Sequence, residues 1–190
     1  MRLKADVSRL TALMLSIAAF ATPVFVAAGQ SLPPKIAQRQ QDMKAMAEAA
    51  KSINAMFKGS SRYNARSFKG AAEAIRSTSG TALSSLFDGS VTAPGSKASA
   101  SIETERQQFD KLALDLAAYA AALSSAADQN PDTLGPGMRM QAGDAAVGGG
   151  PLSKKVDPAR AAGSMPAEHA FHLMLQTCTS CHAKFRVESK

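Results

Sequence analysis

Both cysteines of this 190-residue chain lie near its C-terminus, two residues apart, and a histidine follows the second. They form the segment Cys178-Thr179-Ser180-Cys181-His182. Three chemistries use thiols at this spacing: a disulfide or redox-active dithiol, a structural zinc site, and covalent attachment of a c-type haem. The surrounding sequence discriminates among them.

The dithiol and zinc interpretations each lack a required feature. Dithiol enzymes usually carry C-x-x-C after a strand of an α/β fold, and strand patterns are almost absent here. Zinc needs four ligands, but the other histidines, His169 and His172, lie upstream on the same predicted helix, which cannot wrap around an ion.

A haem attachment site needs only what the segment contains. Each cysteine sulfur can add to one vinyl group of the porphyrin, and the next histidine can present a ring nitrogen to the iron. The sequence therefore predicts one covalent haem c, attached through Cys178 and Cys181, with His182 as an axial iron ligand.

The N-terminus predicts the compartment. Arg2, Lys4 and Arg9 precede an uncharged apolar run from Leu10 to Ala28, which ends in small residues. We expect residues 1–28 to be a cleaved signal peptide and the protein to be periplasmic, without stable membrane insertion after cleavage. A membrane anchor is the alternative, but a proline near the end of the run and the missing stop-transfer flank disfavour it.

The expected mature chain, residues 29–190, is long enough for a single domain with its own core. Loss of the signal lowers the formal net charge from +7 to +5, which suits an acidic redox partner protein. Nucleic acid is not an expected partner, because the chain has no tryptophan, two tyrosines and no basic stripe.

Helical periodicity dominates the mature chain. We predict helices over Pro33–Lys58, Ser61–Ser77, about 101–127, and from near Pro166, with a short helix around Leu83–Phe87. In the first, we expect one face to point into the core: Ile36, Gln40, Met43, Ala47, Ala50, Asn54 and Phe57.

The segment Asn130–Met165 is rich in glycine and proline and has little periodicity, so we expect an insertion of low order there. The predicted fold is all-α: an antiparallel four-helix bundle with the attachment motif on its C-terminal helix. Its stripes are rich in alanine and leave space that a bulky group could fill.

These features resemble the class II c-type cytochromes, the cytochrome c-prime family. The resemblance rests on the signal peptide, the all-helical chain, the attachment motif near the C-terminus and the ending Cys181-His182-Ala183-Lys184-Phe185-Arg186. The first predicted helix adds Arg39-Gln40-Gln41-Asp42-Met43, which resembles the family's Arg-Gln pair and the distal residue after it.

The resemblance implies roles for several residues. Met43 would occupy the distal side of the iron, Arg39 would lie near the haem propionates, and Arg186 would lie near the proximal haem face. Gln40 and Phe185 are further candidates for haem contact. Many family members pair into homodimers, so a homodimer is possible here.

Two functions are compatible with the resemblance, and in neither does the chain act as an enzyme. With Met43 as second axial ligand, as in the low-spin Met/His members, the protein is a one-electron carrier, and this is the function that we predict from the sequence. In the alternative, Met43 only lines the distal face and five-coordinate iron binds NO or CO.

Overall fold

The computed structural model describes residues 32–141, 157 and 159–187. The proposed signal peptide lies outside these residues. Four long helices make up most of the described chain: α1 (Pro34–Phe57), α2 (Ala65–Ser77), α5 (Arg106–Gln129) and α6 (Ala167–Phe185). Short helices α3 (Gly80–Ser85) and α4 (Ser101–Thr104) and the 3-10 helix η2 (Ala162–Ser164) lie between them.

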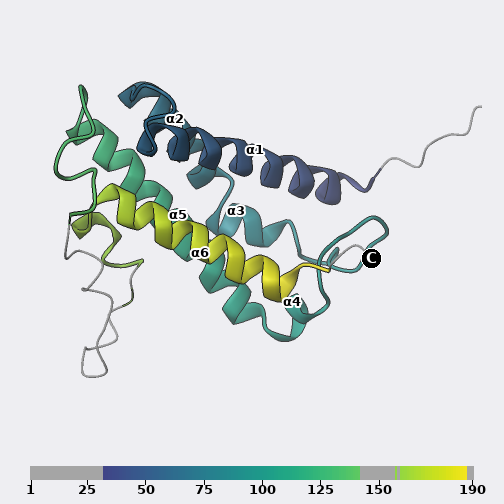
Figure 1. Cartoon of the computed structure of the whole chain (residues 1–190). Helices are drawn as coiled ribbons and strands as arrows, with labels where there is room; N and C mark the ends of the chain where they lie inside the picture. The colour runs from purple at the N-terminus through teal and green to yellow at the C-terminus, as the bar shows by residue number, and fades with distance from the viewer. Residues whose placement is uncertain (1–31, 142–156, 158, 188–190) are drawn as a thin grey trace, which may run out of the picture. The chain divides into compact units, whose positions relative to one another are not determined.

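The four long helices form the predicted antiparallel bundle (Figure 1). α1 packs along α2, α2 along α5, and α5 along α6, whereas the backbones of α1 and α6 come close to each other at few of the described residues. Of the neighbouring helix pairs in the bundle, α1 and α6 are therefore the pair whose backbones stay apart over most of the described residues.

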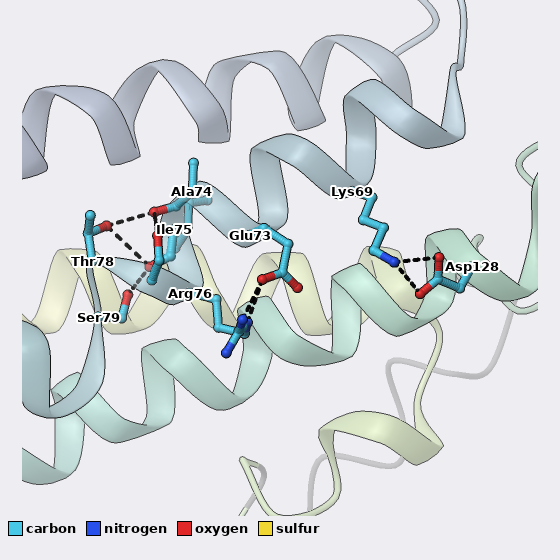
Figure 2. Close-up of polar contacts among 9 residues, drawn as sticks. Lys69, Glu73, Ala74, Ile75, Arg76, Thr78, Ser79 and Asp128 are labelled. Atoms are coloured by element: carbon cyan, nitrogen blue, oxygen red, sulfur yellow. Dashed lines mark hydrogen bonds and ion pairs between the residues drawn. The ribbon is translucent and has the colours of Figure 1, made fainter.

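Local sequence explains where these helices begin. Pro34 opens α1, since a proline in the first turn needs no amide hydrogen bond. The side chain of Asn64 accepts a hydrogen bond from the Ser67 amide and caps α2. At the end of α2, the hydroxyl of Thr78 donates to the Ala74 carbonyl and that of Ser79 to the Ile75 carbonyl (Figure 2).

The third predicted helix is broken, which the periodicity did not indicate. α4 ends at Thr104, and Glu105 leaves helical geometry at φ −119° and ψ 37° before α5 begins. The carboxylate of Glu105 forms an ion pair with Lys184 of α6. The break thus coincides with a contact between residues that are far apart in the sequence. No glycine or proline lies at this point to indicate it.

The prediction of low order for residues 130–165 is wrong for the flanks that the structure describes. Met138 and Ala162 are buried, and the amides of Ala167 and Glu168 donate to the carbonyls of residues 137 and 138. These carbonyls thus satisfy the first amides of α6. The central residues, 142–156 and 158, lie outside the described part of the chain.

The main core draws on all four long helices, and its aromatic rings gather near the α1–α2 turn. Phe57 contacts Phe68 edge to face, with ring centroids 5.4 Å apart, and contacts Phe171 at 5.6 Å. A second cluster surrounds the end of α6, where Phe109 packs between Phe87 and Phe185 at 4.7 and 5.4 Å. We call these the aromatic end and the cleft end of the bundle.

No helix within the described residues is both long enough and apolar enough to cross a bilayer.

Candidate functional site: a cleft between α1 and α6

Two adjoining cavities lie between α1 and α6, where the backbones of the two helices are apart. The first has a volume of about 400 Å³ and the second about 350 Å³. Met43 and Ala47 of α1 and Cys181 and His182 of α6 line both of them. The two cavities thus form one cleft that centres on the motif and on Met43, within the usual size range of cofactor sites.

All of the sequence-predicted site residues line this cleft. Cys178 lines the second cavity, while four other candidates line the first: Arg39, Gln40, Phe185 and Arg186. The helical period explains the clustering on α6, because residues 178, 181, 182 and 185 share one face.

The expected orientation of α1 is correct only in part: Ile36 and Phe57 are buried as expected. Several members of the proposed core stripe line the cleft instead of the packed interior: Gln40, Met43, Ala47, Ala50 and Asn54. The packed interior of α1 includes the neighbouring stripe of Met46, Ile53 and Met56, together with Phe57. An apolar stripe that faces a bound group has the same periodicity as one that faces other helices, so the sequence could not separate the two.

The thiols are in an environment that opposes a redox-active dithiol. Burial raises the pKa of Cys178, and burial followed by the nearby charge of Cys178 raises the pKa of Cys181 to about 11. Catalytic dithiols need the opposite shift, toward a stable thiolate. Zinc is also disfavoured, because no group of three or more potential ligands gathers anywhere in the described residues.

His182 lines the cleft and is exposed to solvent. Its pKa is lowered, first by desolvation and then by the positive charge of Arg186 one turn later. Both effects favour the neutral imidazole, which has a nitrogen lone pair available for a metal.

Arg39 is the unusual group of the cleft. It is 5% exposed, pairs with no carboxylate of the described residues, and has its pKa lowered by burial. One terminal nitrogen donates to the Ser90 carbonyl and the Ser96 hydroxyl, but the other is buried and has no hydrogen-bond partner in the part of the chain that the structure describes. A buried guanidinium nitrogen left this way favours an anionic group nearby.

These observations fit a haem. The cleft is mostly apolar, two thiols and an imidazole line it from one helix, and a thioether lines it from another. The free nitrogen of Arg39 suits a propionate carboxylate.

Sequence reasoning missed several wall residues that come from outside the two helices. Phe87, Ser96, Lys97, Ile102 and Phe109 line the first cavity. Ser96 and Lys97 lie in a connection without periodicity, so no pattern could have indicated them.

The comparisons with known proteins agree with this geometry. The family model described as Cytochrome C′ matches residues 34–144, more than half of the chain. The match ends before the Cys178–His182 motif, so the motif supports the same assignment independently. No curated protein sequence matches the chain.

Several solved structures are similar. Cytochrome c′ from Rhodopseudomonas palustris is 26% identical with a TM-score of 0.54, covering 83% of this chain and 99% of its own. The cytochromes c′ of Shewanella frigidimarina and Thermochromatium tepidum are 20% and 23% identical, with TM-scores of 0.54 and 0.51. They cover 81% of this chain and 94% and 95% of their own, and support the fold alone.

With the family match over α1 to α5, the shared bundle and a haem attachment motif on α6, this chain belongs to the cytochrome c′ family, whose members carry covalently bound haem c.

Proposed function

We propose that the protein binds a small gas, NO or CO, at a five-coordinate haem c whose permanent axial ligand is His182. The observation that carries this proposal is the placement of His182 on α6 and Met43 on α1, in the walls of one apolar cleft where the backbones of the two helices stay apart. The family assignment favours this alternative over the carrier function that we predicted from the sequence.

The chain's thiols provide the attachment. Cys178 packs against the main core and Cys181 against the cleft-end cluster, so the two sulfurs lie at different depths along the cleft. They would each hold one edge of the porphyrin. When bound, the haem supplies an iron that can take up a gas molecule or one electron.

Three further residues complete the site. The unpartnered nitrogen of Arg39 would hold a propionate, and Gln40 and Phe185 would line the haem edge. Arg186 helps to keep His182 neutral through its charge, which leaves the imidazole free to bind iron.

Met43 would form the distal wall. It is half-buried and packs against both hydrophobic clusters, so its side chain crosses the middle of the cleft. As an unbranched apolar side chain it can narrow the distal space without closing it.

A one-electron carrier is the second candidate, and Met43 is also the observation that favours it. Its thioether is a competent haem ligand and lines both cavities with His182. Constant ligation in both oxidation states would ease electron exchange with a partner protein.

The ferrous protein's optical spectrum with and without CO separates the two functions. A high-spin spectrum that CO shifts supports the gas-binding function, and a low-spin spectrum that CO leaves unchanged contradicts it. Met43→Leu is the matched variant, because leucine keeps the volume and removes the sulfur. It should leave the gas-binding protein high-spin, but would convert the carrier from low-spin to high-spin.

Location and assembly belong to the same proposal. A periplasmic site of action follows from the signal peptide expected at residues 1–28 and from the family. One similar structure, 20% identical, is described as a cytochrome c′ with ligand-controlled dimer dissociation, so a homodimer is a reasonable state for this chain as well. Sedimentation with and without CO would test it.

A further inference from the structure

The connection between α3 and α4 contacts both sides of the cleft. Residues 88–99 of this connection, which we call the clasp, bond to the first half of α1 and to the end of α6. Since the backbones of α1 and α6 come close to each other at few of the described residues, the clasp links the distal and proximal walls at the cleft end.

On the α1 side, side chains hold the backbone of the clasp. Arg39 donates to the Ser90 carbonyl at 3.1 Å and to the Ser96 hydroxyl at 3.3 Å. Gln40 donates to the Gly95 carbonyl at 3.2 Å. The Arg39 guanidinium also stacks 4.3 Å from the centre of the Phe87 ring, just before the clasp begins.

On the α6 side, the contacts are between backbones. The Val187 amide donates to the Lys97 carbonyl and the Ser99 amide to the Phe185 carbonyl, each at 2.9 Å, and Ala98 pairs with Arg186 as an antiparallel bridge. These residues begin one turn after His182.

Ser96 joins the two sides. Its hydroxyl donates to the Val91 carbonyl, and its oxygen accepts from Arg39 and from the Ala98 amide at 3.1 Å. Ser96 therefore connects the α1 side of the clasp to the strand-like segment that pairs with the end of α6.

Gly95 makes the α1 contact possible. Its φ of +82° is a conformation that favours glycine, and a Cβ at this position would collide with Leu32. The carbonyl that Gln40 holds thus depends on a backbone geometry that other residues adopt only with strain.

We propose that the clasp sets the separation between Met43 and His182, and that Gln40 and Ser96 are positioning residues for the sixth coordination site of the iron. Met43 is one helical turn after Arg39 and Gln40 on the same helix, so any shift of that turn also moves the distal side chain. Arg39 has a double role, with one terminal nitrogen on the clasp and the other free for the haem. This inference rests on the proposed haem geometry but not on whether Met43 ligates.

Gln40→Ala in the haem-loaded protein is the direct test, because Gln40 is exposed and its loss leaves no buried group unpaired. The ferrous variant should combine with CO about fivefold faster than the wild type, the factor that corresponds to one neutral hydrogen bond. Flash photolysis measures this rate. Ser96→Ala should act in the same direction.

Gln38→Ala is the matched control. Gln38 is exposed on the same helix, and its side-chain amide donates to Asp42 of that helix and not to the clasp. Its CO association rate should equal that of the wild type. Equal rates in the wild type, Gln40→Ala and Ser96→Ala would overturn the proposal, and so would an equal increase in Gln38→Ala.

Amide exchange at Val187 gives a readout that does not need a gas ligand. If the clasp transmits movement, Gln40→Ala should make this amide exchange about fivefold faster, although it lies at the far side of the clasp. Unchanged exchange would overturn the coupling. If the wild type binds no CO but Val187 still responds, the gas-binding function fails and the clasp stands.

Discussion

The aromatic end and the cleft end of the bundle bury similar side chains with different results. At the aromatic end, Phe68, Phe171 and Ile53 are at most 1% exposed and fill the space between helices. At the cleft end, three phenylalanines pack together, yet a cavity remains beside them and a buried arginine nitrogen has no partner among the described residues. The first region is complete as polypeptide, whereas the second requires the haem.

This difference assigns separate tasks to the two ends. Dense apolar packing supplies free energy of folding, and unfilled space with an unpaired polar atom reduces it. The protein therefore relies on the aromatic end for stability and keeps the cleft end for its cofactor.

Removal of the cofactor tests the comparison most severely. In Cys178→Ser with Cys181→Ser, covalent haem should be lost completely, as a pyridine haemochrome assay would show. Amide exchange should then increase in the first half of α1 and the last turns of α6, while amides around Phe57 and Phe68 stay protected. Uniform protection in this apo-protein would contradict the division into two ends.

Truncation at the aromatic end should have the largest effect on stability. Phe68→Ala should lower the free energy of unfolding by about 3–5 kcal/mol, because it removes a fully buried ring. Urea titration of the haem-loaded protein measures this, and the haem spectrum should not change. Leu114→Ala is the control, since this side chain is 52% exposed and its loss should cost less than about 0.5 kcal/mol.

Tyr63 provides a pH-dependent test of how the aromatic end is stabilised. Its hydroxyl donates to the Asn130 carbonyl at 2.7 Å, and burial raises its pKa above the ordinary value of 10.0. Tyr63→Phe should lower stability by about 1 kcal/mol at pH 8 through loss of this bond.

The pH dependence follows from linkage. The folded state holds the Tyr63 proton more tightly than the unfolded state, so this contribution is intact below pH 10.0 and is lost as the pH rises through the raised pKa. Urea titrations at pH 8 and pH 11 should therefore show the gap between wild type and Tyr63→Phe narrowing. Tyr119, whose pKa burial also raises, stays in both proteins as an internal reference. A constant gap would contradict the assigned environment.

The smallest effect is expected at the surface of the aromatic end. Lys69 and Asp128 pair at 2.7 Å with side chains 44% and 58% exposed, and they join α2 to α5 (Figure 2). Lys69→Ala should change stability by less than about 0.5 kcal/mol, and the difference should vanish in high salt. A larger effect in a urea titration would mean that ion pairs, and not only apolar packing, stabilise this end.

Sequence was most informative where function depends on local spacing. Cys178, Cys181 and His182 lie within two turns of one helix, so their chemistry could be predicted without the fold. Met43 and Arg39 required the family resemblance, because α1 and α6 are distant in sequence. The four long helices followed from periodicity, since each buries one continuous stripe.

The remaining features depend on contacts that leave no sequence pattern. The break at Glu105 coincides with a tertiary ion pair, and the clasp is held largely through backbone carbonyls, which every residue has. The stripe of α1 was misassigned because a haem-facing surface has the same apolar period as a helix-facing one. These three failures occur around the cleft, where the bound group and long-range contacts outweigh local preference.

The charge of the cleft has a consequence for biogenesis. Among the described residues that line the two cavities, five are cations and none is a carboxylate: Arg39, Lys44, Lys51, Lys97 and Arg186. Free haem carries two carboxylates, so long-range attraction would guide it to this cleft. Because salt screens such attraction, haem loading should slow as the ionic strength rises.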